Sequence, residues 1–247
     1  MPVAAGSGAV MSVRNTTECA RKQGEVIGVL DLQGGVFEHL DHLERIGISG
    51  FPVKAPADIL NIKGLIIPGG ESTCLARLMS LFGIDDAVKS AFAQGMHIWG
   101  TCAGAILLAG AVIGESPYLS LIDLDIERNS FGSQLDSFTT TAVIPRIARD
   151  PLPLTFIRAP KIRRTGPGVS SLLKIDDYIA AAESDRVLVT VFHPELTGSV
   201  AFHRYFARRC GLVPLDEGSV PDVDPSWDRC SWMRMASDYR RLQPVFS

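Results

Sequence analysis

A cysteine flanked by glycines is the clearest candidate for covalent chemistry in this sequence. Gly100-Thr101-Cys102-Ala103-Gly104 fits the pattern G-x-C-x-G, the cysteine form of a nucleophile elbow, in which a strained strand-to-helix turn presents the nucleophile. A place at a helix N-terminus would favour the thiolate of Cys102 through the helix dipole and free N–H groups. The alternative is a buried structural cysteine, because free cysteine is among the most buried residue types.

A thiolate nucleophile needs a base, and the base needs a group that orients it. Among the five histidines, His193 directly follows the apolar run 187–192, and the end of a strand is a rigid place to present a base. Glu195, two residues further on, is close enough to accept a hydrogen bond from the second ring nitrogen. His193 is therefore the predicted base and Glu195 its orienting carboxylate.

The other four histidines have more ordinary interpretations. His39 and His42 stand three residues apart, which is compatible with a metal site, but no further ligand cluster appears and a solvated helix face is favoured. His97 is expected to be packed within a strand, and His203 to be exposed on the last helix. We therefore predict no metal site.

Pro68-Gly69-Gly70-Glu71-Ser72 contains the candidate oxyanion hole. Unhindered backbone N–H groups at Gly69 and Gly70, together with the N–H of Ala103, would stabilise a tetrahedral oxyanion. The alternative is an ordinary strand-to-helix turn, because Gly-Gly turns are common.

The elements that must position these residues alternate between strand and helix. Apolar runs at 26–30, 51–54, 64–67 and 96–99 predict strands, and helices are expected after the first, third and fourth of them, one capped by Ser72 and Thr73. This alternation predicts an α/β fold with a parallel sheet and helices on both faces. Sites in such sheets lie beyond the carboxyl ends of the strands, where the turns at Gln33-Gly34, Gly69-Gly70 and Cys102 fall.

After about residue 120 the pattern becomes β-rich. Candidate strands are 139–144, 154–157, 178–182 and 187–192, and a last helix is expected at 200–209. Residues 1–25 lack apolar periodicity and are predicted to be a disordered leader. We therefore expect one domain over 26–210 and a C-terminal extension over 211–247.

Composition limits the function classes. The chain has 247 residues, 46% of them hydrophobic and 21% charged, which excludes a disordered chain, a coiled coil and a collagen-like repeat. A net charge of −3 lacks the basic excess of a duplex nucleic-acid binder. Five cysteines, no secretory signal and no uninterrupted membrane-length apolar run favour a cytoplasmic protein in a reducing compartment, with no membrane or nucleic-acid partner.

Together these residues resemble class I glutamine amidotransferases, which use a Cys-His-Glu triad. The resemblance narrows to the PdxT/SNO family, the glutaminase subunit of pyridoxal 5′-phosphate synthase. The segments that carry it are Leu32-Gln33-Gly34, Pro68-Gly69-Gly70-Glu71-Ser72-Thr73, Gly100-Thr101-Cys102-Ala103-Gly104, Glu127-Arg128-Asn129-Ser130-Phe131-Gly132, Phe156-Ile157-Arg158-Ala159-Pro160 and His193-Pro194-Glu195-Leu196-Thr197.

The resemblance implies a fold, an activity and a partner. The fold would be a flavodoxin-like three-layer sandwich with a mostly parallel central sheet and an additional β-rich portion. The activity would be hydrolysis of L-glutamine to L-glutamate and ammonia through a γ-glutamyl thioester, without a cofactor. The ammonia would pass to a (β/α)₈-barrel synthase subunit in a large hetero-oligomer that makes pyridoxal 5′-phosphate, the vitamin B6 cofactor.

Residue roles follow from the same resemblance. Cys102 would attack the glutamine side-chain amide, His193 would move the proton to the leaving ammonia, and Glu195 would orient His193. Gln33 and Gly34 would lie at the partner interface and complete the oxyanion hole. The implied glutamine-binding residues are Gly70, Glu71, Ser72, Arg128, Ile157 and Arg158. For the two arginines the alternative is a surface salt bridge.

The sequence also departs from the family pattern. Asp31 stands where relatives carry a small residue, and a carboxylate there could alter docking or the oxyanion geometry. Two other functions stay open: a DJ-1/PfpI-like cysteine hydrolase, which also carries its cysteine on an elbow, and a non-catalytic subunit that only binds a partner.

Overall fold

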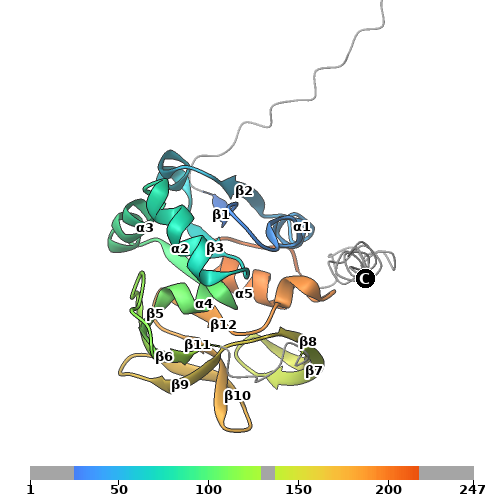
Figure 1. Cartoon of the computed structure of the whole chain (residues 1–247). Coiled ribbons are helices and arrows are strands. Elements are labelled where there is room, and N and C mark those ends of the chain that lie inside the picture. Colours follow the sequence, from blue (N-terminus) through green and yellow to red (C-terminus); the bar gives the residue numbers. More distant parts are fainter. Residues whose placement is uncertain (1–24, 129–136, 217–247) are drawn as a thin grey trace, which may run out of the picture.

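The computed structural model describes residues 25–128 and 137–216. Within them the strands form a ten-stranded sheet and a separate two-stranded sheet (Figure 1). One half of the large sheet is parallel and follows the order β2-β1-β3-β4-β12. These strands are β1 (Val26–Leu30), β2 (Ser49–Val53), β3 (Gly64–Ile67), β4 (His97–Thr101) and β12 (Val187–Thr190).

The central parallel strands are apolar because they are covered on both faces. Every residue of β3 and of β12 is buried, which is the pattern expected of strands inside a parallel sheet. The edge strand β2 is more exposed and contains Pro52, which an edge tolerates because one side of the strand needs no ladder hydrogen bond.

Five helices in the described residues pack in two groups. α1 contacts α5, while α2 contacts α3 and α4, and Figure 1 shows the two groups on opposite sides of the parallel strands. Their bounds are α1 (Val36–Arg45), α2 (Ser72–Leu81), α3 (Ile84–Ala93), α4 (Ala103–Leu108) and α5 (Ala201–Arg209), with short 3₁₀ helices η1 (Pro56–Asn61) and η2 (Pro194–Leu196). The predicted α/β sandwich is thereby confirmed.

The other half of the large sheet is mainly antiparallel, as the β-rich second half of the sequence predicts. From β12 the order continues through β11, β9 and β6 to β5, and β10 pairs with β11. The remaining strands are β5 (Ala109–Val112), β6 (Ile122–Glu127), β7 (Ser137–Ile144), β8 (Ala148–Ile157), β9 (Lys161–Thr165), β10 (Ser170–Ile175) and β11 (Tyr178–Glu183). The sequence did not predict β5, β6, β9 and β10.

The start of α2 corrects one prediction. The N-cap is Glu71 rather than Ser72 or Thr73, because Glu71 has an extended backbone and its Oε2 accepts a hydrogen bond from the Cys74 N–H at 2.7 Å. Ser72 is instead the first residue of the helix and is buried.

The described residues that follow α5 pack against the domain. Leu212 is buried, and the Leu215 N–H donates to the Ile46 carbonyl oxygen at 2.9 Å. The rest of the predicted extension and residues 1–24 of the predicted leader lie outside the described residues. In the part of the chain that is described, no helix combines the length and apolar character needed to cross a membrane.

Candidate active site

The candidate site lies at the carboxyl ends of four neighbouring parallel strands. Ile67 of β3 is opposite Gly100 of β4, and Thr101 of β4 is opposite Thr190 of β12, so these strands end at the same edge. The loop after β1 joins them there, because Gly34 contacts Gly69 in the loop after β3. This is the edge at which ligands bind in open α/β sheets.

Cys102 occupies the strained turn that the motif predicts. It separates β4 from α4 and has φ +46° and ψ −103°, a conformation that non-glycine residues rarely adopt. The glycines on either side are sterically required. A Cβ at Gly100 would lie 2.5 Å from the Gly104 carbonyl carbon, and a Cβ at Gly104 would lie 2.1 Å from the Ile67 carbonyl oxygen.

The elbow motif predicts an open nucleophile, but the Cys102 residue is only 8% exposed. The cause is the loop after β3, which lies against it. A Cβ at Gly69 would be 3.3 Å from Cys102 Cβ and 2.3 Å from His193 Cε1. Gly69 therefore fits between the cysteine and the histidine, and only glycine leaves room for both.

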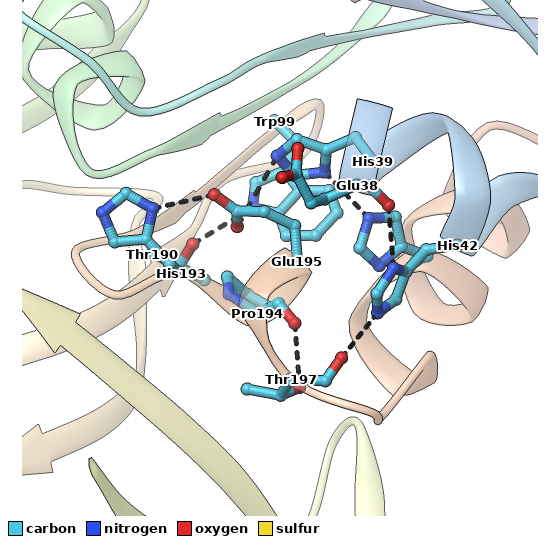
Figure 2. Close-up of polar contacts among 10 residues, drawn as sticks. Glu38, His39, His42, Trp99, Thr190, His193, Pro194, Glu195 and Thr197 are labelled. Atoms are coloured by element: carbon cyan, nitrogen blue, oxygen red, sulfur yellow. Dashed lines mark hydrogen bonds and ion pairs between the residues drawn. The ribbon is translucent and has the colours of Figure 1, made fainter. Parts of the chain in front are cut away.

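His193 and Glu195 are paired as predicted (Figure 2), and the imidazole is also hydrogen-bonded to the cysteine. His193 Nδ1 lies 2.8 Å from Glu195 Oε1, and the other contact of the ring is a side-chain hydrogen bond with Cys102. Burial disfavours a charged ring, but Glu195 and Cys102 outweigh it and raise the pKa of His193 well above its usual value. The arrangement therefore favours an imidazolium beside the sulfur.

Glu195 is fully buried, yet its environment keeps it ionised. Burial acts to raise its pKa, but His39 and His193 outweigh this effect and the pKa of Glu195 is lowered. A thiol, an imidazole and a carboxylate thus stand in sequence, which is the arrangement of a nucleophilic triad.

The other described cysteines lack this environment. Cys210 is buried against Gly64 and Phe206, and burial raises the pKa of its thiol to about 12. Cys74 is half-buried in the first turn of α2. Cys102 alone among the three described cysteines has a hydrogen-bonded base.

The predicted oxyanion-hole residues are brought together by two loops. A Cβ at Gly34, where φ is +96°, would lie 1.9 Å from the Gly69 carbonyl oxygen. The side-chain oxygen Oε1 of Gln33 accepts a hydrogen bond from the Glu71 N–H at 2.9 Å, beside Gly70. Ala103 is the first residue of α4, where N–H groups have no partner within the helix.

Two of the predicted glutamine-binding residues form an ion pair. Arg128 Nη2 lies 3.3 Å from Glu71 Oε1, and Arg128 Nη1 lies 2.5 Å from Glu115 Oε2. The salt-bridge interpretation of Arg128 therefore holds in this structure. Its role in binding glutamine stays a prediction, and it would require exchange of a carboxylate partner.

Ile157 and Arg158 stand at the end of β8. This end lies beside the triad, because the His193 N–H donates to the Thr155 carbonyl oxygen at 2.8 Å. Ile157 is half-buried, while Arg158 is exposed and has φ +44°. Asn129-Ser130-Phe131-Gly132, part of the motif that follows Arg128, falls outside the described residues.

The predictions for three histidines are wrong. His39, His42 and His203 are fully buried rather than solvated or exposed. They meet because α1 packs against α5, and their rings lie close together beside the indole of Trp99. His97 is half-buried in β4. Within residues 25–128 and 137–216, no group of three or more His, Cys, Asp or Glu side chains is arranged to hold a metal ion.

Asp31, which is predicted to depart from the family pattern, has a local partner. Its Oδ2 lies 3.1 Å from Lys54 Nζ, and its N–H donates to the Val53 carbonyl oxygen at 2.8 Å. The carboxylate is thus paired with the residue that follows β2.

Comparison with known proteins places these features in a family. Residues 29–212 match the SNO glutamine amidotransferase family. "Pyridoxal 5'-phosphate synthase subunit PdxT" of Syntrophus aciditrophicus is 60% identical over 210 residues, which cover 85% of this chain and 94% of that protein. The protein of the same name from Clostridium beijerinckii is 46% identical over 183 residues, covering 74% and 96% of the two chains.

A solved structure supports the same assignment. A crystal structure described as a glutamine amidotransferase is 39% identical, superposes with a TM-score of 0.71, and covers 75% of this chain and 99% of that one. The predicted class I glutamine amidotransferase fold, flavodoxin-like with an additional β-rich portion, is thereby confirmed. The chain belongs to the SNO glutamine amidotransferase family.

Proposed function

We propose that this chain is the glutaminase subunit of a pyridoxal 5′-phosphate synthase, a cytoplasmic enzyme that hydrolyses L-glutamine to L-glutamate and ammonia. The observation that carries the proposal is the contact of His193 with both Cys102 and Glu195, the latter at 2.8 Å. The names of the relatives from Syntrophus aciditrophicus and Clostridium beijerinckii support the assignment to this synthase.

The first half-reaction forms a thioester. The Cys102 thiolate attacks the side-chain carbonyl carbon of glutamine, and the oxyanion is stabilised by N–H groups of Gly69, Gly70 and Ala103. The His193 imidazolium donates its proton to the amide nitrogen, and the C–N bond breaks to release ammonia. The γ-glutamyl group remains bonded to the sulfur of Cys102.

The second half-reaction frees the enzyme. His193, now neutral, takes a proton from water, and the hydroxide attacks the thioester carbonyl. The C–S bond breaks, glutamate leaves, and the proton on His193 restores the starting pair with the Cys102 thiolate. Glu195 stays ionised and stabilises the imidazolium through both steps.

The ammonia is used by a second subunit. Ammonia released into water is protonated and then no longer nucleophilic, so direct transfer to a (β/α)₈-barrel synthase subunit in a hetero-oligomer is chemically useful. The loop at Gln33 and Gly34 is the proposed contact that completes the oxyanion hole. Its position supports this, since Gly34 touches Gly69 and the neighbouring Phe37 is 76% exposed.

A glutaminase assay with and without the synthase subunit tests the proposal. The wild type should release glutamate slowly alone and faster in the complex, and Cys102→Ala should abolish both rates. Undiminished activity of Cys102→Ala would contradict the assignment of the nucleophile. Binding to the synthase without any ammonia release by the wild type would instead favour a non-catalytic subunit.

A further inference from the structure

The catalytic carboxylate has an oxygen that the triad does not use. Glu195 Oε1 contacts His193, whereas Oε2 faces His39 Nε2 across 3.6 Å. Both of these facing atoms are buried and have no hydrogen-bond partner in the described residues. Since a buried carboxylate oxygen without a donor is costly, we expect a donor to face Glu195 Oε2.

His39 is held in place from behind by a second buried histidine. Its Nδ1 lies 2.8 Å from His203 Nε2. Its ring meets the indole of Trp99 edge-on, with centroids 5.5 Å apart (Figure 2). Burial lowers the pKa of His39 to about 4 and that of His203 well below its usual value, so both rings are neutral at neutral pH.

The tautomers of the two neutral rings are linked. One of the two facing nitrogens, His39 Nδ1 and His203 Nε2, must donate and the other must accept. If His203 donates, the proton of His39 is on Nε2 and points at Glu195. If His39 donates from Nδ1, a bare lone pair on Nε2 faces the carboxylate. Only the first arrangement gives both oxygens of Glu195 a donor.

We propose that His39 is a positioning residue for the triad, held by His203, and that its Nε2–H fixes the second oxygen of Glu195. This inference rests on the proposed glutaminase function. The series of contacts then runs from Cys102 through His193 and Glu195 to His39 and His203, and connects the elbow to helices α1 and α5.

The charges around the carboxylate explain why this contact matters. Glu38 on α1 acts against the charge of Glu195, while His193 and His39 favour it. The other ionisable groups that face the two buried histidines are His42 and Arg45 on α1, with Asp41 beside them. Without the donor from His39, we expect Glu195 to lose part of its orientation and to take a proton at a higher pH.

A matched pair of substitutions at His39 tests the inference. In His39→Gln the amide reaches the position of Nε2 and keeps a donor toward Glu195, whereas in His39→Asn it reaches only the position of Nδ1, toward His203. In the complex with the synthase subunit, His39→Asn should lower kcat on the order of tenfold, because it removes the donor that faces the second oxygen of the buried carboxylate, and leave KM unchanged. It should also move the acid limb of the kcat–pH profile to higher pH.

A rescuing substitution at His39 and a control substitution at His42 distinguish a positioning role of His39 from a packing role. His39→Gln should recover most of kcat and the wild-type acid limb. His42→Gln is the control, because His42 is equally buried on the same helix but contacts the carbonyl oxygens of Glu38 and Thr197 rather than the triad. It should leave the pH profile unchanged.

Three outcomes would overturn the inference: equal kcat and acid limb in His39→Asn and the wild type, equal loss in His39→Asn and His39→Gln, or the same shifted profile in His42→Gln. The wild type and Cys102→Ala are measured in the same assay, so that a failure of the proposed function can be recognised. If the wild type is inactive in the complex or Cys102→Ala is active, the proposed function fails. If both behave as expected, only the role of His39 is refuted.

Discussion

Replacing Glu195 with glutamine tests how much the buried carboxylate contributes to catalysis. The substitution keeps the shape of the side chain but removes the charge that faces His193 Nδ1 at 2.8 Å. A hydrogen bond to a charged group contributes about 1.5–3 kcal/mol. Since about 1.4 kcal/mol corresponds to a factor of ten, kcat should fall by about 10- to 150-fold.

The same change should alter the pH dependence. Glu195 helps to raise the pKa of His193, so Glu195→Gln lowers that pKa toward its usual range. The imidazolium, which protonates the leaving ammonia, is then lost at a lower pH. The alkaline limb of the kcat–pH profile should therefore move to lower pH, while KM for glutamine stays unchanged, because Glu195 is buried behind His193.

Steady-state ammonia release by the complex with the synthase subunit is the assay. Glu38→Gln is the matched control, since it neutralises a half-buried carboxylate on α1 that lies near Glu195 but outside the triad. The control should retain its activity and its alkaline limb. If Glu195→Gln kept kcat within about threefold of wild type, with an unmoved alkaline limb, the orienting role of Glu195 would be refuted.

Three further predictions follow from the geometry. Gly69→Ala should lower kcat strongly but change the melting temperature of the same samples little, because its Cβ would lie 2.3 Å from His193 Cε1 and displace the ring. A kcat equal to that of the wild type would contradict the packing described. Arg128→Ala should raise KM for glutamine more than it changes kcat, and an unchanged KM would leave Arg128 with only its ion pairs. The free energy of unfolding, measured by denaturant titration, should fall as the pH is lowered from 6.5 to 4. His39 should supply about 1.4 kcal/mol per pH unit of that fall, because it stays neutral when folded and is protonated when unfolded, and His39→Gln should lack this part.

The parallel half of the sheet was predictable because each of its central strands is a short apolar run that ends before a turn. The run Leu65-Ile66-Ile67, for example, is flanked by Gly64 and by Pro68-Gly69. The candidate site could be predicted for the same reason. In a parallel sheet all carboxyl ends meet at one edge, so motifs that follow separate strands converge whatever lies between them.

Four strands of the other half could not be predicted because their residues do not favour a strand until a neighbouring strand pairs with them. β6 and β9 carry charged residues, and such a composition is typical of a loop when a strand is considered without its partner. In the structure Asp125 is opposite Arg164, and Arg164 Nη2 lies 2.8 Å from Asp125 Oδ1. β5 is formed by Ala109-Gly110-Ala111-Val112, which continues the apolar run of α4 without a break in composition.

The buried histidines were missed for a physical reason of the same kind. His39 and His42 are polar and have no ligand cluster nearby in the sequence, which favours a solvated face. Their burial depends on His203, which is 164 residues away from His39 in the chain. One signal was available: His39 and His42 share the buried face of α1 with Leu43, at spacings of three and four residues.

The central claim is that Cys102 is the nucleophile for glutamine, and covalent labelling tests it most directly. The complex with the synthase subunit would be treated with an electrophilic glutamine analogue, with and without competing glutamine, and the modified residue mapped by mass spectrometry. We predict one adduct per chain on Cys102, suppressed by glutamine and strongly reduced in Glu195→Gln, with Cys74 and Cys210 unmodified. An unlabelled Cys102, or labelling of another cysteine that glutamine suppresses equally, would contradict this account.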